Sequence, residues 1–358
     1  MSFVARQSHS TVLFYAPNDL YLTHFRPVIG ELRRSLGVPV AITGPKGAER
    51  QMRVAERKRF VPRAQAESLR WSAVVFSSSR GTSGFAEETK KVLLPHSLGG
   101  GKLVEGVSWQ YGRERTLRGG APIFNLILEA SRAEAERVEV TFPWLRGTVA
   151  GVGLPLLDPL AKLGRRRNNS VLIQTTYGQS SLLEQVGPVL FASEASRIAA
   201  ALRVPVLVSL HPNHWTGYAS APKLGPEVAR RVARGVVVLR PYTPLEHYFA
   251  KVGLCITDHT NLSVVAVMLG IPVRVAASSS TDVELDESSP VARVMRSAAR
   301  IDIASGWVEQ LAGGPTSEGA LGLAEVRDAL LDGFGGAAER AARAIIDPGS
   351  TRFLRPNW

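Results

Sequence analysis

Polar side chains follow several short apolar runs of the chain, where each run gives way to a loop. His96 follows "VLLP", Thr175 to Gly178 follow "VLIQ", His211 follows "VLVSL", Tyr242 follows "VVVLRP" and Asp258 follows "LCIT". In open parallel sheets, ligands bind beyond the carboxyl ends of the strands, where loops and helix N-termini meet. These side chains are therefore the first candidates for a binding or catalytic site.

The segment "GLCITDHTNLSVVAVMLGIPV", 253–273, combines a buried strand, a polar cluster and an apolar helix. Free amides at a helix start, the positive end of the helix dipole and nearby hydroxyls favour a phosphate or diphosphate. The alternative is that Thr260 or Asn261 only caps the helix. The predicted phosphate-binding residues are Asp258, Thr260, Asn261, Ser263 and, from another strand end, Gly178.

A second candidate is the loop of "VLLPHSLGGGK", 92–102, which joins a histidine, three glycines and a lysine. Gly99, Gly100 and Gly101 would let backbone amides approach an oxyanion or an acceptor phosphate, and Lys102 would add a point charge. The alternative is a flexible glycine-rich turn after an ordinary strand.

Short apolar runs alternate with amphipathic stretches throughout the chain, which is the pattern of parallel sheets covered by helices. In the first half the runs "TVLFYA", "VPVAIT", "SAVVFSSS" and "KVLLPH" predict strands, and "RVEVTF" and "GTVAGVG" are expected to complete them. In the second half the strands are "SVLIQTT", "PVLVSLH", "VVVLRPY", "GLCITD" and "PVRVAA", with a helix over "GPVLFASEASRIAAALR".

The length of 358 residues exceeds one hydrophobic core and predicts two α/β domains. The segment "LAKLGRRRNN" interrupts the alternation of strands and helices, and we interpret it as a linker between the two domains. We expect an N-terminal Rossmann-like domain over 1–160, a basic linker over 161–169 and a C-terminal Rossmann-like domain over 170–335. The last segment, 336–358, is predicted to form a helix and a tail, and packing of this helix on the first domain is one arrangement that we consider.

Composition narrows the classes of function. The net charge of +12 suits an anionic partner: nucleic acid, an acidic membrane surface or a phosphorylated substrate. A solvated basic surface is the alternative, and the absence of zinc-finger, RRM and KH signatures argues against nucleic acid. Cys255 is the only cysteine, so an intrachain disulfide and a cysteine-based zinc site are excluded.

The termini and acidic segments add further expectations. The N-terminal residues lack the pattern of a secretion signal, and no apolar run approaches a membrane span, so we expect a cytoplasmic protein. The acidic loop "TDVELDESSP" matches no calcium loop and is expected to be solvated. An Asp-x-Asp pair at a strand end would indicate an obligatory metal, and the sequence has no such pair. We therefore expect neither a metal nor a cofactor.

Several motifs resemble, in the right order, those of the CDP-glycerol glycerophosphotransferase family, the teichoic-acid primases and polymerases. The family's Thr-Asp-Tyr-Ser-Ser is similar to "TDHTN", which keeps Thr257 and Asp258. Its His-Gly-Thr-Pro-Leu-Lys loop is similar to "LPHSLGGGK", which keeps His96 and Lys102. The resemblance covers roughly residues 90 to 275, although each motif is short.

Three further segments fit the same family. "GVGLPLLDPL" resembles its Gly-x-Pro-x-x-Asp turn, matching Gly153, Pro155 and Asp158, and "RRRNNSVLIQTTYG" resembles its basic linker and the following strand. "SLHPN" resembles its His-Pro at a strand end and matches His211 and Pro212. The helix after the motif departs from the family, because Val265 stands where a carboxylate is usual.

The resemblance implies a GT-B architecture, with two Rossmann-like domains whose parallel sheets face each other across a cleft. The donor would bind the second domain, an acceptor hydroxyl would attack the glycerol-bearing phosphorus of CDP-glycerol, and CMP would leave. His96 would accept the proton of the acceptor, and His211 would stabilise charge on the phosphoryl group. A metal pair of His211 and His214 lacks a third ligand at recognisable spacing.

The segment "RPYTPLEHYFAKV" lies where this fold often holds the nucleobase. Tyr242 would stack on the base, and backbone groups near Thr243 and Leu245 would read its edge. The alternative is that these residues only pack the loop.

The expected function is transfer of a polyol phosphate from a CDP-activated donor to a phosphorylated or lipid-linked acceptor in cell-wall or polysaccharide synthesis. Peripheral contact with an anionic inner membrane leaflet is an option for the basic surface. One alternative keeps the fold and makes the protein a nucleotide-sugar glycosyltransferase or a UDP-sugar epimerase. The alternative from another class is a non-catalytic nucleotide-binding or scaffold protein.

Overall fold

The computed structural model describes residues 10–95, 103–104, 107–108, 110–162, 169–178, 180–217, 223–277, 284–312 and 316–347. The chain divides into two compact units. The first contains the described residues up to 95, from 107 to 162 and from 329 onward, and the second contains 103–104 and 169 to 328. The division falls close to the predicted linker, and the final helix belongs to the first unit.

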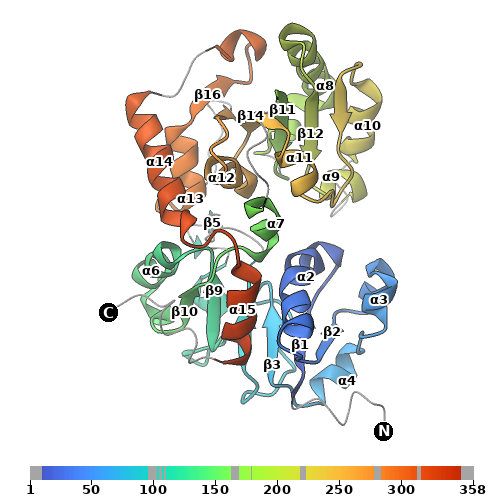
Figure 1. Cartoon of the computed structure of the whole chain (residues 1–358), viewed down its shortest axis with the longest axis vertical. Helices are drawn as coiled ribbons and strands as arrows, with labels where there is room; N and C mark the ends of the chain where they lie inside the picture. Colours follow the sequence, from blue (N-terminus) through green and yellow to red (C-terminus); the bar gives the residue numbers. More distant parts are fainter. Residues whose placement is uncertain are drawn as a thin grey trace. The chain divides into compact units, whose positions relative to one another are not determined.

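The first unit is built on a six-stranded parallel sheet in the order β10-β9-β4-β3-β1-β2 (Figure 1). Its strands are β1 (Val12–Tyr15), β2 (Val40–Thr43), β3 (Ala73–Phe76), β4 (Lys91–Leu93), β9 (Leu126–Glu129) and β10 (Val149–Gly151). Its helices are α2 (Asp19–Arg34), α3 (Val54–Arg57), α4 (Arg63–Glu67), α5 (Arg113–Thr116), α6 (Arg132–Thr141), α7 (Asp158–Ala161) and α15 (Ala337–Ile346).

Short elements complete this unit: the strands β6 (Val107–Ser108), β7 (Leu117–Arg118) and β8 (Ala121–Pro122), and the 3-10 turns η2 (Ala48–Gln51), η3 (Pro143–Leu145) and η4 (Pro155–Leu157). Alternate residues of β1 enter the two hydrophobic clusters of the unit, with Phe14 on one face and Leu13 on the other. Both faces of the sheet are therefore buried, as parallel sheets require.

The prediction of a strand at "RVEVTF" was wrong, because this segment forms the second half of α6. The alternating valines suggested a strand, but Ser131 starts a helix before them by accepting a hydrogen bond from the amide of Glu134. Ala135 and Val138 then lie on one buried helical face. The sheet contains instead the strand β9, which precedes this helix and was not predicted.

The second unit has a six-stranded parallel sheet in the order β13-β12-β11-β14-β15-β16. The strands of this sheet are β11 (Ser170–Thr175), β12 (Val206–Leu210), β13 (Val236–Val238), β14 (Val252–Thr257), β15 (Val273–Ala277) and β16 (Ala299–Asp302). This is the strand order of the dinucleotide-binding fold, and it reverses between β11 and β14. The short strand β5 (Leu103–Val104) belongs to the second unit but not to this sheet.

The helices of the second unit are α8 (Leu182–Leu202), α9 (Asn213–Thr216), α10 (Leu224–Arg231), α11 (Glu246–Phe249), α12 (Asn261–Met268) and α13 (Pro290–Ser297), followed by the 3-10 turn η5 (Val308–Gln310) and by α14 (Ser317–Leu331). Gly187, with a φ of 75°, divides α8 into two helical pieces, and the second piece begins at the predicted Gly187–Pro188 start. None of the described helices combines the length and the apolarity needed to cross a bilayer.

Candidate functional site

The residues predicted from the second half meet at the carboxyl edge of the second sheet, where its strand order reverses. The loop after β11 carries Thr176 to Gly178, and the loop after β14 carries Asp258 to Thr260. These strands are neighbours, with Gln174 in register with Thr257, although the two loops lie far apart in the sequence. A ligand site is expected at such a position in an open α/β sheet.

Asp258 holds the loop after β11 in place. Its carboxylate is 2% exposed and accepts hydrogen bonds from the hydroxyl of Thr175 (2.8 Å) and from the amides of Thr176 (3.0 Å) and Leu182 (2.9 Å). The carboxylate therefore joins the end of β11 and the start of α8 to the β14 loop. These bonds give Asp258 a structural part in holding the loop, and its contact with a donor phosphate stays a prediction.

The start of α12 shows the capping arrangement that was the alternative to phosphate binding. The hydroxyl of Thr260 accepts a hydrogen bond from the amide of Leu262 at 3.4 Å. The hydroxyl of Ser263 is buried and donates to the carbonyl of Thr260 at 2.7 Å. Asn261 is the first residue of the helix and is half-buried. Two of the three predicted side chains thus have partners within the helical turn, and Asn261 is the remaining candidate contact.

Gly178 adopts a left-handed φ of 114°, which glycine tolerates at no steric cost. Its amide donates to Glu184 at 3.1 Å, and the amide of Glu184 is in turn capped by the hydroxyl of Ser181. The predicted phosphate contact of the Gly178 amide would therefore have to replace this internal bond.

His214 is a buried support of the same loop. Its Nε2 lies 2.9 Å from the carbonyl oxygen of Thr176, so Nε2 carries a proton and donates. Its Nδ1 lies 3.8 Å from a carboxylate oxygen of Glu184 and has no hydrogen-bond partner in the part of the chain that the structure describes. Burial lowers the pKa of His214 below its ordinary value. The imidazole is therefore neutral near pH 7.

His211 is held from two sides. The amide of Asn213 donates to its Nδ1 at 3.2 Å, and the ring of Tyr177 stacks on its imidazole with centroids 5.7 Å apart. Because a backbone amide can only donate, Nδ1 must accept, and the neutral ring carries its proton on Nε2. His211 is thus set as a hydrogen-bond donor through Nε2, the form that suits contact with a phosphate oxygen.

The predicted nucleobase segment follows β13 at the same edge of the sheet. Tyr242 adopts a φ of 64° and is 42% exposed, a strained conformation for a residue with a side chain. The hydroxyl of Thr243 donates to the carbonyl of Arg240 at 2.7 Å. The carbonyl of Leu245 accepts the amide of Phe249 at 2.9 Å. Only the Tyr242 ring keeps the exposure that base stacking would require.

Val265 is 2% exposed inside α12. A carboxylate at this position would be buried, which costs free energy unless its charge is paired, and the valine offers no group for ribose hydroxyls. Any contact with a ribose must therefore come from another element.

The predicted residues of the first unit divide into two groups. His96, Gly99, Gly100, Gly101 and Lys102 lie outside the described residues. The Gly-x-Pro-x-x-Asp turn has a structural part: the carboxylate of Asp158 accepts the amides of Ala337 and Ala338 at 2.9 and 2.8 Å, at the start of α15. Gly153 is needed because an added Cβ would lie 2.0 Å from the carbonyl oxygen of Gly333.

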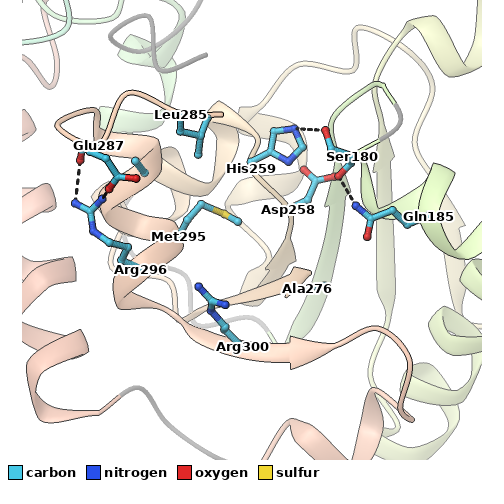
Figure 2. Close-up of a pocket in the computed structure, with 11 residues that line it drawn as sticks. Ser180, Gln185, Asp258, His259, Ala276, Leu285, Glu287, Met295, Arg296 and Arg300 are labelled. Carbon is cyan, nitrogen blue, oxygen red and sulfur yellow. Dashed lines mark hydrogen bonds and ion pairs between the residues drawn. The ribbon is translucent and has the colours of Figure 1, made fainter. Parts of the chain in front are cut away.

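A pocket of about 180 Å³ adjoins the β14 loop within the second unit (Figure 2). Its polar side chains are Ser180, Gln185, Asp258, His259, Glu287, Arg296 and Arg300. The imidazole of His259 lies 3.4 Å from the hydroxyl of Ser180 and is almost fully buried. Leu285 and Glu287 of the acidic loop line the pocket, and the side chain of Glu287 is 83% exposed, in keeping with a solvated loop.

Sequence reasoning missed the two arginines of this pocket. Arg296 lies on α13 and Arg300 on β16, beyond the last motif of the resemblance. The only signal was the basic content of "ARVMRSAARID", which a solvated surface explains equally well.

No protein-family model and no curated protein sequence match this chain. Solved structures match over nearly its whole length. A variant of the wall teichoic acid polymerase TagF soaked with CDPG has a TM-score of 0.65 and 12% identity, covering 96% of this chain and 89% of that one. A putative UDP-N-acetylglucosamine 2-epimerase from Listeria monocytogenes has a TM-score of 0.58 and 15% identity, covering 98% of both chains.

The complex of S. aureus MnaA with UDP matches with a TM-score of 0.59 and 12% identity, covering 97% of this chain and 99% of that one. Likeness at these identities shows the fold. The chain therefore has the predicted two-domain GT-B fold, and the structural similarity to TagF agrees with the resemblance found in the sequence.

Proposed function

We propose that the chain is a transferase that moves a polyol phosphate from a CDP-activated donor to a hydroxyl acceptor. The observation that carries the proposal is the arrangement at the carboxyl edge of the second sheet. His211, fixed as an Nε2 donor, follows β12, and Asp258 holds the loop after the neighbouring strand β11. A GT-B fold shared with TagF supports this choice.

In the proposed reaction, an oxygen of the acceptor forms a bond to the phosphorus that carries the polyol. The bond from that phosphorus to the bridging oxygen breaks, and CMP leaves with the electron pair. His211 would donate its Nε2 proton as a hydrogen bond to a phosphate oxygen on which charge develops, without giving the proton up. His96, assigned from the resemblance, would accept the proton of the acceptor hydroxyl.

The proposal includes the setting of the reaction. The donor would be a nucleotide-activated polyol and the acceptor a phosphorylated or lipid-linked alcohol in cell-wall or polysaccharide synthesis. The protein would work in the cytoplasm, and its basic surface would contact the anionic inner leaflet peripherally. No metal or cofactor is assigned a part.

Ligand-induced stabilisation tests the donor base. A ligand that binds only the native state raises the melting temperature, so CDP, UDP, GDP and their conjugates are compared in one thermal-shift panel. CDP-glycerol is expected to give the largest shift and to release CMP when an acceptor is added. If only UDP conjugates stabilise the chain, the second candidate, a UDP-sugar enzyme similar to the matched epimerases, replaces the first.

Variants of His211 test the mechanism. His211→Ala removes the Nε2 donor and is expected to lower kcat about 100-fold or more, whereas His211→Gln places an amide donor near the same position and should recover part of the rate. Donor affinity from the thermal-shift panel should change little in both. If the unsubstituted chain binds CDP-glycerol but never turns it over, the non-catalytic alternative is correct.

A further inference from the structure

The pocket beside the β14 loop gathers polar groups from separate elements. Ser180 and Gln185 come from the loop and helix after β11, His259 from the loop after β14, Arg296 from α13 and Arg300 from β16. Figure 2 shows these side chains around one hollow, with Ser180, Gln185 and His259 opposite Arg296. A small concave site with a few converging polar groups is the usual form of a ligand site.

The two guanidinium groups of the pocket differ in their surroundings. Arg296 forms an ion pair with Glu287, and both side chains are largely solvent-exposed. Arg300 is exposed as well, but it forms no ion pair among the residues that the structure describes. A guanidinium offers five donors in a planar fork that matches two oxygens of a phosphate. Arg300 is therefore the group in this pocket best suited to bind an anion.

The remaining walls set the size and polarity of the ligand. Leu285, Met295, Ala276 and Ala292 form an apolar side of the pocket. The hydroxyl of Ser180 and the amide of Gln185 lie on the polar side and can donate to or accept from hydroxyl groups. Two carboxylates also line the pocket: that of Asp258 accepts hydrogen bonds from the loop after β11, and that of Glu287 pairs with Arg296. The volume of about 180 Å³ accommodates a short polar chain but is below the usual range for a whole nucleotide.

We propose that this pocket holds the group to be transferred, a short-chain polyol phosphate, with its phosphate on Arg300 and its hydroxyls near Ser180 and Gln185. The proposal rests on the proposed function, since it assigns a place to the part of the donor that leaves the nucleotide. The position of the pocket agrees with this assignment, because His259 of its lining lies directly before the start of α12, where the sequence predicted the diphosphate.

Binding of glycerol 3-phosphate alone to the full-length chain is the direct test, measured by isothermal titration calorimetry. Arg300→Ala is expected to weaken binding about 10-fold to 100-fold, the range for loss of charge-assisted hydrogen bonds, and Arg300→Lys to weaken it less. The matched control is Arg293→Ala, which removes an arginine of α13 that pairs with Glu325 and does not line the pocket. It should bind as the unsubstituted chain does.

Inorganic phosphate and glycerol are run as separate probes. Glycerol 3-phosphate should bind more tightly than either, since both ends of the ligand have contacts. Equal affinity for inorganic phosphate would reduce the pocket to an anion site and overturn the polyol assignment. No binding of glycerol 3-phosphate, or equal weakening by Arg293→Ala, would overturn the proposal as a whole.

A comparison of CDP-glycerol with CMP separates this proposal from the proposed function, because CMP lacks the phosphate that is transferred. Arg300→Ala should lower the affinity for CDP-glycerol by the same factor as for glycerol 3-phosphate and leave that for CMP nearly unchanged. If CMP is released but the variant weakens both nucleotides equally, the pocket assignment fails and the transferase stands. If glycerol 3-phosphate binds through Arg300 but no CDP conjugate binds, the pocket stands and the donor is wrong.

Discussion

Two buried carboxylates, one in each unit, lie at strand ends and differ in the hydrogen-bond donors around them. Glu129 ends β9 of the first sheet and is 1% exposed, and Asp258 follows β14 of the second and is 2% exposed. Asp258 accepts three strong hydrogen bonds, two of them from backbone amides. Glu129 accepts the hydroxyl of Tyr111 and, at 3.4 Å, the amide of Ala130.

Burial raises the pKa of Glu129 to about 7, and the hydrogen bond from Tyr111 offsets only part of this effect. The neighbouring Glu134 raises the pKa further, whereas Arg137 lowers it. The carboxyl group of Glu129 thus exchanges a proton near neutral pH inside a closed core. The comparison teaches that burial alone does not decide the role of a carboxylate. The number and strength of the hydrogen-bond donors around it decide that role as well.

The largest effect is expected from Asp258→Ala. The substitution leaves the hydroxyl of Thr175 and the amides of Thr176 and Leu182 without their buried acceptor, which should cost about 4 kcal/mol of unfolding free energy. Urea unfolding measures the loss, and Asp258→Asn, which keeps one oxygen, should lose less. The exposed Asp328→Ala is the control. A loss below 1 kcal/mol in Asp258→Ala would show that the loop does not depend on this carboxylate.

Glu129→Gln should change how stability depends on pH. The folded pKa of about 7 exceeds the ordinary 4.5, so the folded state holds a proton that the unfolded state releases. The stabilisation is complete below pH 4.5 and is lost as pH rises through 7, by about 3 kcal/mol in total. Glutamine cannot titrate, so the variant should lack this loss when unfolding is compared at pH 5 and pH 8. An unchanged pH dependence would contradict the assignment of Glu129.

A third carboxylate, Asp158, is only partly buried and should matter less. Asp158→Ala removes the acceptor for the first amides of α15, a loss of about 1 kcal/mol, typical for a helix cap. Hydrogen exchange at the start of α15 and thermal unfolding of the first unit measure it. Asp158→Asn keeps one of the two acceptors and should lose less than the alanine variant, whereas equal losses in both variants would indicate that the charge and not the cap matters.

The smallest effect concerns His214, and it has the opposite sign to that of Glu129. Burial lowers the folded pKa of His214, so the unfolded state takes up a proton first as pH falls below the ordinary value of 6.5. The second unit should therefore lose stability on acidification from pH 7.5, whereas the first gains it through Glu129. Unfolding of His214→Gln between pH 7.5 and 5.5 checks this, because glutamine keeps a donor for Thr176 but does not titrate. Equal slopes in both proteins would rule out His214 as the cause.

Much of the fold could be predicted because strands buried on both faces appear as short apolar runs. "TVLFYA" and "GLCITD" became β1 and β14 for this reason. The strand β9 and the helix at "RVEVTF" were missed, because Ser131 and the buried helical face of Ala135 and Val138 outweighed a locally alternating pattern.

The candidate site was predicted only in outline. The polar residues at the ends of β11, β12 and β14 were found, but their partners were not. The hydrogen bonds of Asp258 with the amides of Thr176 and Leu182, in a loop far away in the sequence, were not predicted. Arg300 carried no motif at all.

The sequence by itself determined which residues stand at strand ends, because the length and apolarity of each run decide where a buried strand must stop. Only the tertiary structure decided what those residues contact. The placement of β11 beside β14 brings Asp258 to the amides of another loop, and β16 brings Arg300 to the pocket. Hydrogen-bond partners depend on distances of a few ångströms between segments that are remote in the chain, and no local pattern of residues encodes them.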